Sequence, residues 1–370
     1  MWGMNLSVGI VGLPNVGKST LFNALLKKQQ ACVANFPFAT IEPNVGIVPV
    51  PDRRLKKLSE IVKESDNLSF FPPEVPATCE FLDIAGLIAG AHKGEGLGNK
   101  FLSHIREVDA ICHVVRNFSD PEVVKQGIVD PKTDLEVVET ELKLADFETL
   151  EKQKDPGNTP DKELKKRFEV VLKLKAALER GIAAREVDLS EEEGRIAKQL
   201  SLLTAKPILV VLNVDEGSLV NADNLEGEFA SQVGIGKDQV IAICAKTEMD
   251  LADLPAEEQS EYLKGIGAVS SGLEKLIKKA FATLGLITFL TAGEKEVRAW
   301  TIKDGMTAQE ASGAIHTDFI KNFIKADVCD FENFTSLGGW KNAREGGKVR
   351  SEGREYLMKD GDVVEFKIGV

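Results

Sequence analysis

The feature that most restricts the fold is a phosphate-binding-loop motif near the N-terminus. Residues 12–19 read Gly-Leu-Pro-Asn-Val-Gly-Lys-Ser and match the pattern GxxxxGK[ST] at every fixed position, from Gly12 to Ser19. The motif follows an apolar run and opens a helical pattern, which is the context that it requires. Its main-chain amides would surround phosphate oxygens, Lys18 would reach the β- and γ-phosphates, and the Ser19 hydroxyl would bind Mg²⁺. The sequence therefore predicts a nucleoside triphosphate site.

Short apolar runs continue along the chain and alternate with helical segments. Strands are predicted at residues 6–11, 78–82, 110–115, 207–212 and 240–244. This alternation indicates an α/β fold with a mostly parallel sheet and helices on both faces. Ligands of such sheets bind at the carboxyl ends of the strands, where the motifs of this chain lie.

Two further regions differ from this pattern. Residues 131–154 and 161–180 are rich in Glu, Lys and Leu with helical periodicity, and a third helix is predicted at 190–203. From residue 286 onward, alternating strands at 297–302 and 363–368 flank a helix predicted to run from Thr307 towards Phe323. We expect a nucleotide-binding domain (1–125 and 204–285), an inserted helical coiled-coil arm (126–203) and a C-terminal α+β domain (286–370).

A DxxG motif at Asp83–Gly86 ends the second predicted strand. At this place Asp83 would contact the ligands of Mg²⁺ and not the ion itself, and the Gly86 amide would lie near the γ-phosphate. Thr40 lies between the two motifs and is the candidate switch threonine, which would bind Mg²⁺ only while the γ-phosphate is present.

The base-reading position carries an unusual sequence. Residues 213–216, Asn-Val-Asp-Glu, follow a strand where a GTPase carries NKxD, so Glu216 replaces the aspartate that reads guanine. A longer carboxylate cannot keep the geometry for guanine but could accept the adenine amine, which predicts a preference for ATP. A shifted register in which Asp215 still reads guanine stays open. Residues 244–246, Cys-Ala-Lys, resemble the SAK loop that supports the base.

The motifs GLPNVGKST, NFPFATIEPN, DIAGLIAGAHKGEGLGN and the NxxE replacement together resemble the YchF/Obg-like ATPase family, over nearly the whole chain. The resemblance implies a slow Mg²⁺-dependent ATPase that associates with ribosomes, with a coiled-coil arm and a C-terminal β-grasp (TGS) domain. It also implies nucleotide contacts from Asn15, Val16, Gly17, Lys18, Ser19, Thr20, Val214 and Glu216, and Mg²⁺ ligation by Ser19 and Thr40.

Leu87 occupies the place where Ras-type GTPases carry a glutamine that orients water. Hydrolysis must then be slow until a partner supplies a group, or another residue must substitute. His113 and His92 are the candidates, because an imidazole near its ordinary pKa can orient or activate water. The alternative for His113, which lies within a predicted strand, is a histidine of the core.

Composition narrows the setting. Five scattered cysteines without a CxxC pair argue against a disulfide framework or zinc site and favour the cytoplasm. No apolar run reaches the roughly 20 residues of a membrane span. The net charge of −12 disfavours general binding of nucleic acid, DNA included, so RNA contact would need a local basic patch, for which residues 341–354 are the candidate.

Three functions remain open. The first is an ATP-driven switch for a ribosomal partner. The second is a GTPase of ribosome assembly. The third is a nucleotide-gated binding protein whose hydrolysis is incidental, which the leucine at position 87 favours.

Overall fold

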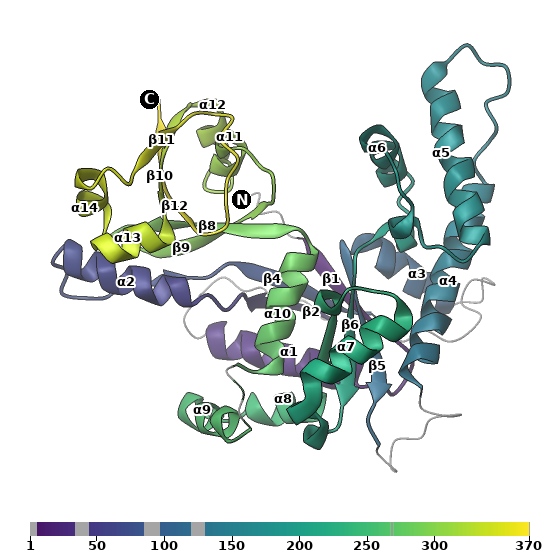
Figure 1. The fold of residues 1–370 in the computed structure, drawn as a ribbon, viewed down its shortest axis with the longest axis horizontal. Helices are drawn as coiled ribbons and strands as arrows, with labels where there is room; N and C mark the ends of the chain where they lie inside the picture. The colour runs from purple at the N-terminus through teal and green to yellow at the C-terminus, as the bar shows by residue number, and fades with distance from the viewer. Residues whose placement is uncertain are drawn as a thin grey trace. The chain divides into compact units, whose positions relative to one another are not determined.

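The computed structural model describes residues 6–33, 44–84, 97–119, 130–266, 268 and 270–369. These residues form two compact units, each described by itself (Figure 1). The larger unit comprises Ser7–Gly46 and Glu80–Thr283, and the smaller includes Ile47–Cys79 and Leu284–Val370. The three domain boundaries expected from the sequence stay a prediction. The compact units differ from them at Ile47–Cys79, which clusters with the C-terminal part of the chain.

The six-stranded sheet of the larger unit has the strand order β2-β4-β1-β5-β6-β7, and its edge strand β2 runs on into the segment Ile47–Cys79. Its strands are β1 (Ser7–Val11), β2 (Val45–Pro49), β4 (Thr78–Asp83), β5 (Ala110–Asn117), β6 (Ile208–Val214) and β7 (Val240–Ile243). The pairs β4–β1, β1–β5, β5–β6 and β6–β7 are parallel, which confirms the five predicted strands and the predicted sheet type. The edge strand β2 was not predicted.

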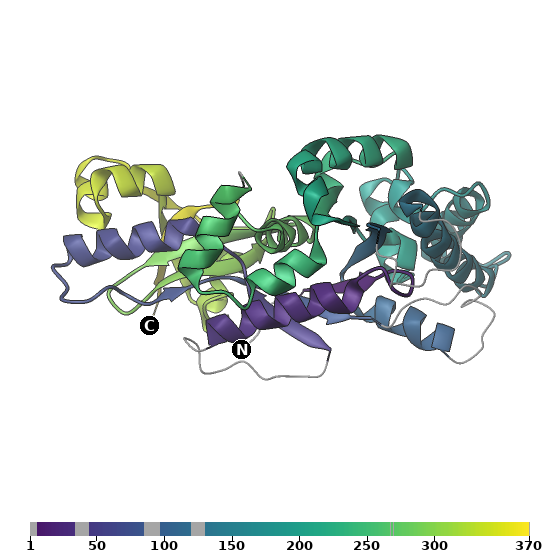
Figure 2. The same cartoon turned by 90° about the horizontal axis from the view of Figure 1, so that it is seen from below.

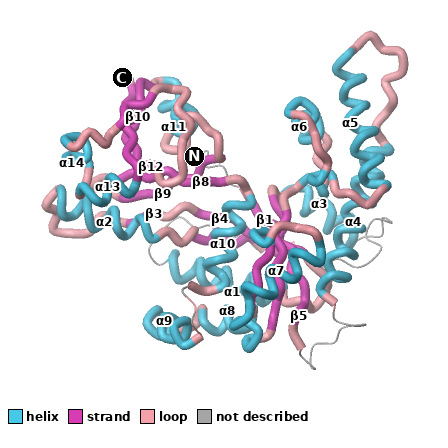
Figure 3. Tube along the Cα trace, in the orientation of Figure 1, coloured by secondary structure: helices cyan, strands magenta, loops and turns pink. Residues whose placement is uncertain are grey.

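Helices cover both faces of this sheet, as expected (Figure 3). On one face α3 (Leu97–Glu107), α4 (Pro131–Glu151) and α7 (Ala222–Val233) share a core with strand residues such as Ile111 and Val115. Helices α1 (Lys18–Val33) and α10 (Gly272–Thr283) pack against the other face. Shorter helices follow the last strands of the sheet: η4 (Glu216–Asn221), η5 (Lys237–Gln239), α8 (Ala245–Leu251) and α9 (Ala256–Gly265).

The inserted arm consists of the far part of α4, with α5 (Lys162–Glu179), η2 (Ala184–Glu186), α6 (Glu191–Gln199) and η3 (Leu203–Ala205). The arm lies at one end of the larger unit in both views (Figures 1 and 2). The two long helices are confirmed. The third is shorter than predicted, because the chain turns at Ser201 with a φ of 50° and cannot continue as a helix.

Helix α4 belongs to two hydrophobic cores. Leu135, Val138 and Leu142 pack in the core of the sheet, whereas Leu150 packs in the separate core of the arm. Asp146 lies between these two sets with no exposed surface, and its carboxylate accepts hydrogen bonds from the Leu203 and Thr204 amides and from the Thr204 hydroxyl. The arm is therefore anchored to the sheet through one continuous helix.

The smaller unit contains a mixed sheet with the order β11-β10-β12-β8-β9-β3. Its elements are α2 (Arg53–Ser65), β3 (Glu74–Val75), β8 (Leu286–Ala292), β9 (Val297–Lys303), α11 (Ala308–Ser312), α12 (Thr317–Lys321), β10 (Phe323–Asp330), α13 (Phe331–Leu337), α14 (Trp340–Glu345), β11 (Arg350–Glu352) and β12 (Asp362–Ile368). The strands β8 and β12, first and last of the C-terminal part, are parallel neighbours, whereas β8 pairs with β9 in antiparallel fashion. This arrangement is the one expected of a β-grasp domain.

The helix predicted from Thr307 to Phe323 is wrong in its length. The Thr307–Glu310 capping box is present, but α11 ends at Ser312. The His316 side chain then accepts a hydrogen bond from the Asp318 amide and begins a second helix. A new cap within the segment breaks the helix, and Phe323 becomes the first residue of a strand instead.

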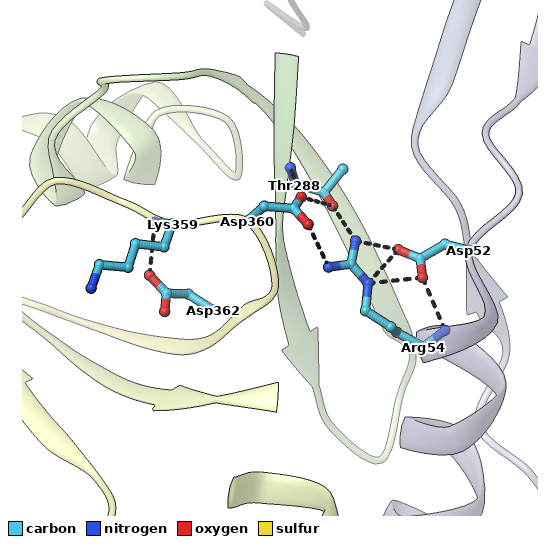
Figure 4. A network of polar contacts seen from close by, with 6 residues as sticks. All are labelled: Asp52, Arg54, Thr288, Lys359, Asp360 and Asp362. Atoms are coloured by element: carbon cyan, nitrogen blue, oxygen red, sulfur yellow. Dashed lines mark hydrogen bonds and ion pairs between the residues drawn. The ribbon is translucent and has the colours of Figure 1, made fainter. Parts of the chain in front are cut away.

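Arg54 joins α2 to the C-terminal part of the smaller unit (Figure 4). Its guanidinium donates hydrogen bonds to Asp52 at 2.8–3.0 Å, to the Thr288 hydroxyl at 2.8 Å and to Asp360 at 2.8 Å. Asp360 in turn accepts a hydrogen bond from the Thr288 amide at 2.9 Å. This network brings together three segments that are far apart in sequence, and it explains why the stretch around α2 clusters with the C-terminal strands.

Candidate nucleotide-binding site

The phosphate-binding loop connects β1 to α1 and depends on two glycines with positive φ angles. A Cβ on Gly12, where φ is 150°, would lie 2.4 Å from the Val114 carbonyl oxygen. A Cβ on Gly17, where φ is 98°, would lie 2.2 Å from Nδ2 of Asn213. Asn15 also has a positive φ, of 61°, which asparagine tolerates better than most residues. The loop is thus fitted closely against the strands behind it.

The exposure of the loop residues agrees with a ligand on their outer side. Asn15, Ser19 and Thr20 are exposed, whereas Val16 is buried against the sheet. Ser19 and Thr20 lie in the first turn of α1, where unpaired amides and the helix dipole favour an anion.

Lys18, the first residue of α1, and Asp83, the last residue of β4, interact through their charges at this loop. Lys18 is only 8% exposed, and its ammonium donates a hydrogen bond to the Leu13 carbonyl at 2.7 Å. Burial lowers the pKa of Lys18, and the nearby Asp83 charge opposes this change. Burial likewise raises the pKa of Asp83, opposed by the charge of Lys18. The two charges are desolvated and only partly compensated by each other, which suits a site completed by a charged ligand.

Asn213 holds the two sides of the site together. Its Nδ2 donates a hydrogen bond to the Val16 carbonyl at 2.9 Å, and its Oδ1 accepts one from the Ala245 amide at 3.0 Å. The amide group therefore connects the phosphate-binding loop with the loop after β7. We predicted that Asn213 binds the nucleotide. In the structure its side chain instead makes hydrogen bonds to the two segments on either side of it, and a contact with the nucleotide stays a prediction.

The remaining base-side residues divide by exposure. Glu216 and Lys246 are exposed, whereas Val214, Cys244 and Ala245 are buried. The Val214 side chain packs in the sheet core, so a contact from this residue to a base would have to come from its main chain.

In the alternative register of the base-reading motif, Asp215 and not Glu216 would contact the base. The Asp215 carboxylate accepts a hydrogen bond from the Ser119 amide at 3.1 Å. This contact occupies one oxygen of Asp215, and the assignment of base reading to Glu216 stays a prediction.

Sequence reasoning missed Tyr262. Its hydroxyl donates a hydrogen bond to Oε1 of Glu216 at 2.5 Å from α9, and it also interacts with the Thr247 side chain. Tyr262 follows Glu216 by 46 residues and belongs to no local motif. Only its position as a lone tyrosine in an otherwise polar helix distinguishes it in the sequence.

His113 lies in the core. It is 1% exposed, and within the described part of the chain neither ring nitrogen has a hydrogen-bond partner. Burial, with the charges of Lys18 and Arg185, lowers its pKa to about 3, so the ring is neutral at physiological pH. This burial favours the alternative interpretation, a core histidine, over a residue that orients water.

Several predicted residues lie outside the described ranges. These are Thr40, Gly86, Leu87 and His92. Their predicted roles in Mg²⁺ binding, γ-phosphate contact and hydrolysis stay predictions.

The described residues fit a magnesium site of the kind predicted. Ser19 offers an exposed hydroxyl, and the Asp83 carboxylate ends the neighbouring strand. Oxygen ligands of this type suit Mg²⁺, which commonly takes only one or two protein ligands together with substrate phosphates. Accordingly, the described ranges contain no group of three or more His, Cys, Asp or Glu side chains suited to holding a metal without a nucleotide.

Comparison with known proteins agrees with this geometry. A family model described as "50S ribosome-binding GTPase" matches residues 7–156, and the C-terminal model of the YchF GTPases, a domain described as of unknown function, matches residues 286–369. The "Ribosome-binding ATPase YchF" of Bacillus subtilis (strain 168) is 49% identical over 99% of this chain and 100% of its own length. The chain belongs to the YchF family.

Other YchF proteins support the same assignment. The "Ribosome-binding ATPase YchF" of Escherichia coli O157:H7 is 47% identical over 99% of this chain and 100% of its own length. The solved structure titled "Structure of the Schizosaccharomyces pombe YchF GTPase" is 36% identical, with a TM-score of 0.85, and the match covers 99% of this chain and 100% of that one. The chain is therefore a P-loop nucleoside triphosphatase with the YchF fold.

The basic segment 341–354 is partly neutralised within its own unit. Arg350 forms ion pairs with Asp330 at 3.0 Å and Glu352 at 3.2 Å, and Arg344 pairs with Glu365 at 2.5 Å. Lys341 and Lys348 are exposed and form no ion pair with the described residues. Contact with RNA thus stays a prediction, and it would depend on these two lysines more than on Arg350.

The described helices were also compared with the requirements of a membrane span. None of them is both long and apolar enough to cross a bilayer.

Proposed function

We propose that this protein is a Mg²⁺-dependent ATPase of the cytoplasm that binds ribosomes and changes its affinity for them with the bound nucleotide. The observation that carries the hydrolase assignment is the buried Lys18 of a complete phosphate-binding loop, whose charge interacts with that of the half-buried Asp83. The ribosomal partner is inferred from the full-length likeness to relatives that bear the name "Ribosome-binding ATPase".

Each residue of the site has a distinct part in this proposal. The main-chain amides of the loop and Lys18 hold the phosphates and stabilise the charge that develops during transfer of the γ-phosphoryl group to water. Ser19 and Thr40 would hold Mg²⁺, which supplies further charge neutralisation when bound. Asp83 would orient the water ligands of the ion.

The preference for ATP rests on Glu216. Its carboxylate can accept a hydrogen bond from the exocyclic amine of adenine, whereas the guanine carbonyl at that position would repel it. The names of the relatives support both readings, since the bacterial proteins are called ATPases and the fungal structure a GTPase. A GTPase remains the second candidate for that reason.

Calorimetric titration separates the two. We expect ATP with Mg²⁺ to bind at least about tenfold more tightly than GTP, a difference of about 1.4 kcal/mol. A preference for GTP would contradict the role given to Glu216 but leave the hydrolase assignment intact. Cosedimentation with ribosomes in ATP and in ADP tests the partner, and equal binding in both states would show that nucleotide does not control it.

A further inference from the structure

The carboxylate proposed to read the base is itself held by another side chain. Glu216 begins η4, is exposed and has three side-chain torsions, so by itself it could adopt many positions. The Tyr262 hydroxyl donates a hydrogen bond to its Oε1 at 2.5 Å. Among the described residues Tyr262 is the one hydrogen-bond partner of this carboxylate. One oxygen is thus fixed, and Oε2 is left to accept a hydrogen bond from a ligand.

Tyr262 connects the two loops on the base side of the site. Besides Glu216, its hydroxyl interacts with the side chain of Thr247, which lies in the first turn of α8 and is 8% exposed. Burial, followed by the hydrogen bond and charge of Glu216, raises the pKa of Tyr262 to about 12. The hydroxyl therefore remains protonated, and able to donate, throughout the physiological pH range.

Two other polar side chains near this position also have hydrogen-bond partners. Asn213 uses its amide nitrogen on Val16 and its oxygen on Ala245. Asp215 accepts the Ser119 amide. Under the proposed function, discrimination between purines depends on where the Glu216 carboxylate lies. A carboxylate that is already held in place loses less freedom when the base binds.

We infer that Tyr262 is a positioning residue for base selection, which holds the Glu216 carboxylate where it accepts the exocyclic amine of adenine. This inference rests on the proposed function, since it assigns a determinant to the same site. Without the hydroxyl, the Glu216 carboxylate can turn to accept hydrogen bonds from the ring N–H and amine of guanine. The affinity for ATP should therefore fall more than the affinity for GTP.

The test is a double-mutant cycle on the full-length protein with ATP and GTP as probes, in the presence of Mg²⁺. Tyr262→Phe keeps the ring and removes the hydroxyl. We expect ATP affinity to fall by about fivefold and GTP affinity to stay within about twofold, which lowers the ratio of the two. Tyr356→Phe removes the same hydroxyl from the other tyrosine of the chain, in the smaller unit, and should leave both affinities unchanged.

The second half of the cycle uses Glu216→Ala. If Tyr262 acts through Glu216, adding Tyr262→Phe to this variant changes the ATP:GTP ratio no further. Equal losses for both nucleotides in Tyr262→Phe, or additive effects in the double variant, would overturn the inference, because they indicate a structural role for α9 or an independent contact.

The outcomes also separate this inference from the proposed function. The ratio measured on the unaltered protein tests the preference for ATP, whereas the change in that ratio in Tyr262→Phe tests the positioning role. A protein that prefers GTP but whose ratio still shifts in Tyr262→Phe refutes only the preference. One that prefers ATP with an unshifted ratio refutes only the role of Tyr262.

Discussion

The two compact units treat charged side chains in opposite ways. In the larger unit, Lys18 at the start of α1 and Asp83 at the end of β4 are both partly removed from water, and their charges only partly neutralise each other. In the smaller unit, Arg54 and Arg350 are each surrounded by carboxylates and hydroxyls at hydrogen-bond distance. From this contrast we expect the first arrangement to bind a ligand and the second to stabilise the fold. Substitutions in the two units should therefore affect different properties.

Removing Lys18 should give the largest effect of these substitutions, and the effect should fall on ATP binding. We expect Lys18→Ala to weaken ATP binding by at least about 100-fold, because a main contact to the phosphates is lost. Stability should change little, since a partly compensated buried charge is removed. Calorimetric titration and thermal unfolding measure the two effects. Lys27→Ala, further along the same helix, is the matched control, and ATP affinity retained in Lys18→Ala would contradict the site.

Removing Arg54 tests whether the charges of the smaller unit stabilise its fold. Arg54→Ala should destabilise the smaller unit by about 1–2 kcal/mol, because Asp52 and Asp360 lose a shared partner. Nucleotide affinity should remain that of the unaltered protein. Hydrogen exchange of the α2 amides reports the local change. Lys57→Ala, on the same helix, should stay within about 0.5 kcal/mol. Unchanged protection of α2 in Arg54→Ala would show that the network contributes nothing.

His113, in the core of the larger unit, should make the stability of the protein depend on pH. Its pKa of about 3 in the folded protein lies below that of an unfolded histidine, so the unfolded state takes up the proton first as pH falls. The stability is complete above about pH 6.5 and declines below it, by about 1 kcal/mol between pH 7.0 and pH 5.5. Urea unfolding at both values should show this decline, which His113→Leu should lack and His104→Gln should keep. An identical decline in His113→Leu would assign it to other groups.

The smallest effect is expected from the basic segment of the smaller unit. Replacing Lys341 and Lys348 with glutamine should weaken ribosome cosedimentation by about two- to threefold per lysine and flatten its salt dependence, if these residues contact RNA phosphates. Arg350→Gln should instead lower stability, because its charge already belongs to an internal network. Binding that keeps its salt dependence without both lysines would exclude the segment as an RNA contact.

Local sequence patterns predicted the parts that depend on them. The five predicted strands of the parallel sheet are short and mostly apolar, and the phosphate-binding loop has a fixed spacing. The capping box at Thr307 was also correct, although the helix behind it ended early because His316 provides a second cap. The amphipathic helix α2 carried a readable pattern, with Leu55, Leu58 and Ile61 on its buried side, but it was overlooked.

Contacts between distant segments could not be read in the same way. The Arg54 network joins residues separated by 234 and 306 positions, and Tyr262 meets Glu216 across 46. No periodicity or motif links such positions, because they become neighbours only when the sheets form. The sequence also left two interpretations of His113 open, since a strand pattern does not reveal whether a polar residue within it reaches solvent.

The smaller unit is built from two stretches of chain that are far apart in sequence, and this matters for the design of fragments of the protein. A fragment that stops before Leu284 would retain α2 and β3 but lose the strands against which they pack. The apolar side of α2, including the fully buried Leu58, would then face water and promote aggregation. An expression fragment meant to isolate the nucleotide-binding part would therefore have to keep β2 and β4 and replace residues 50–77 between them with a short linker, and a simple C-terminal deletion should yield insoluble material.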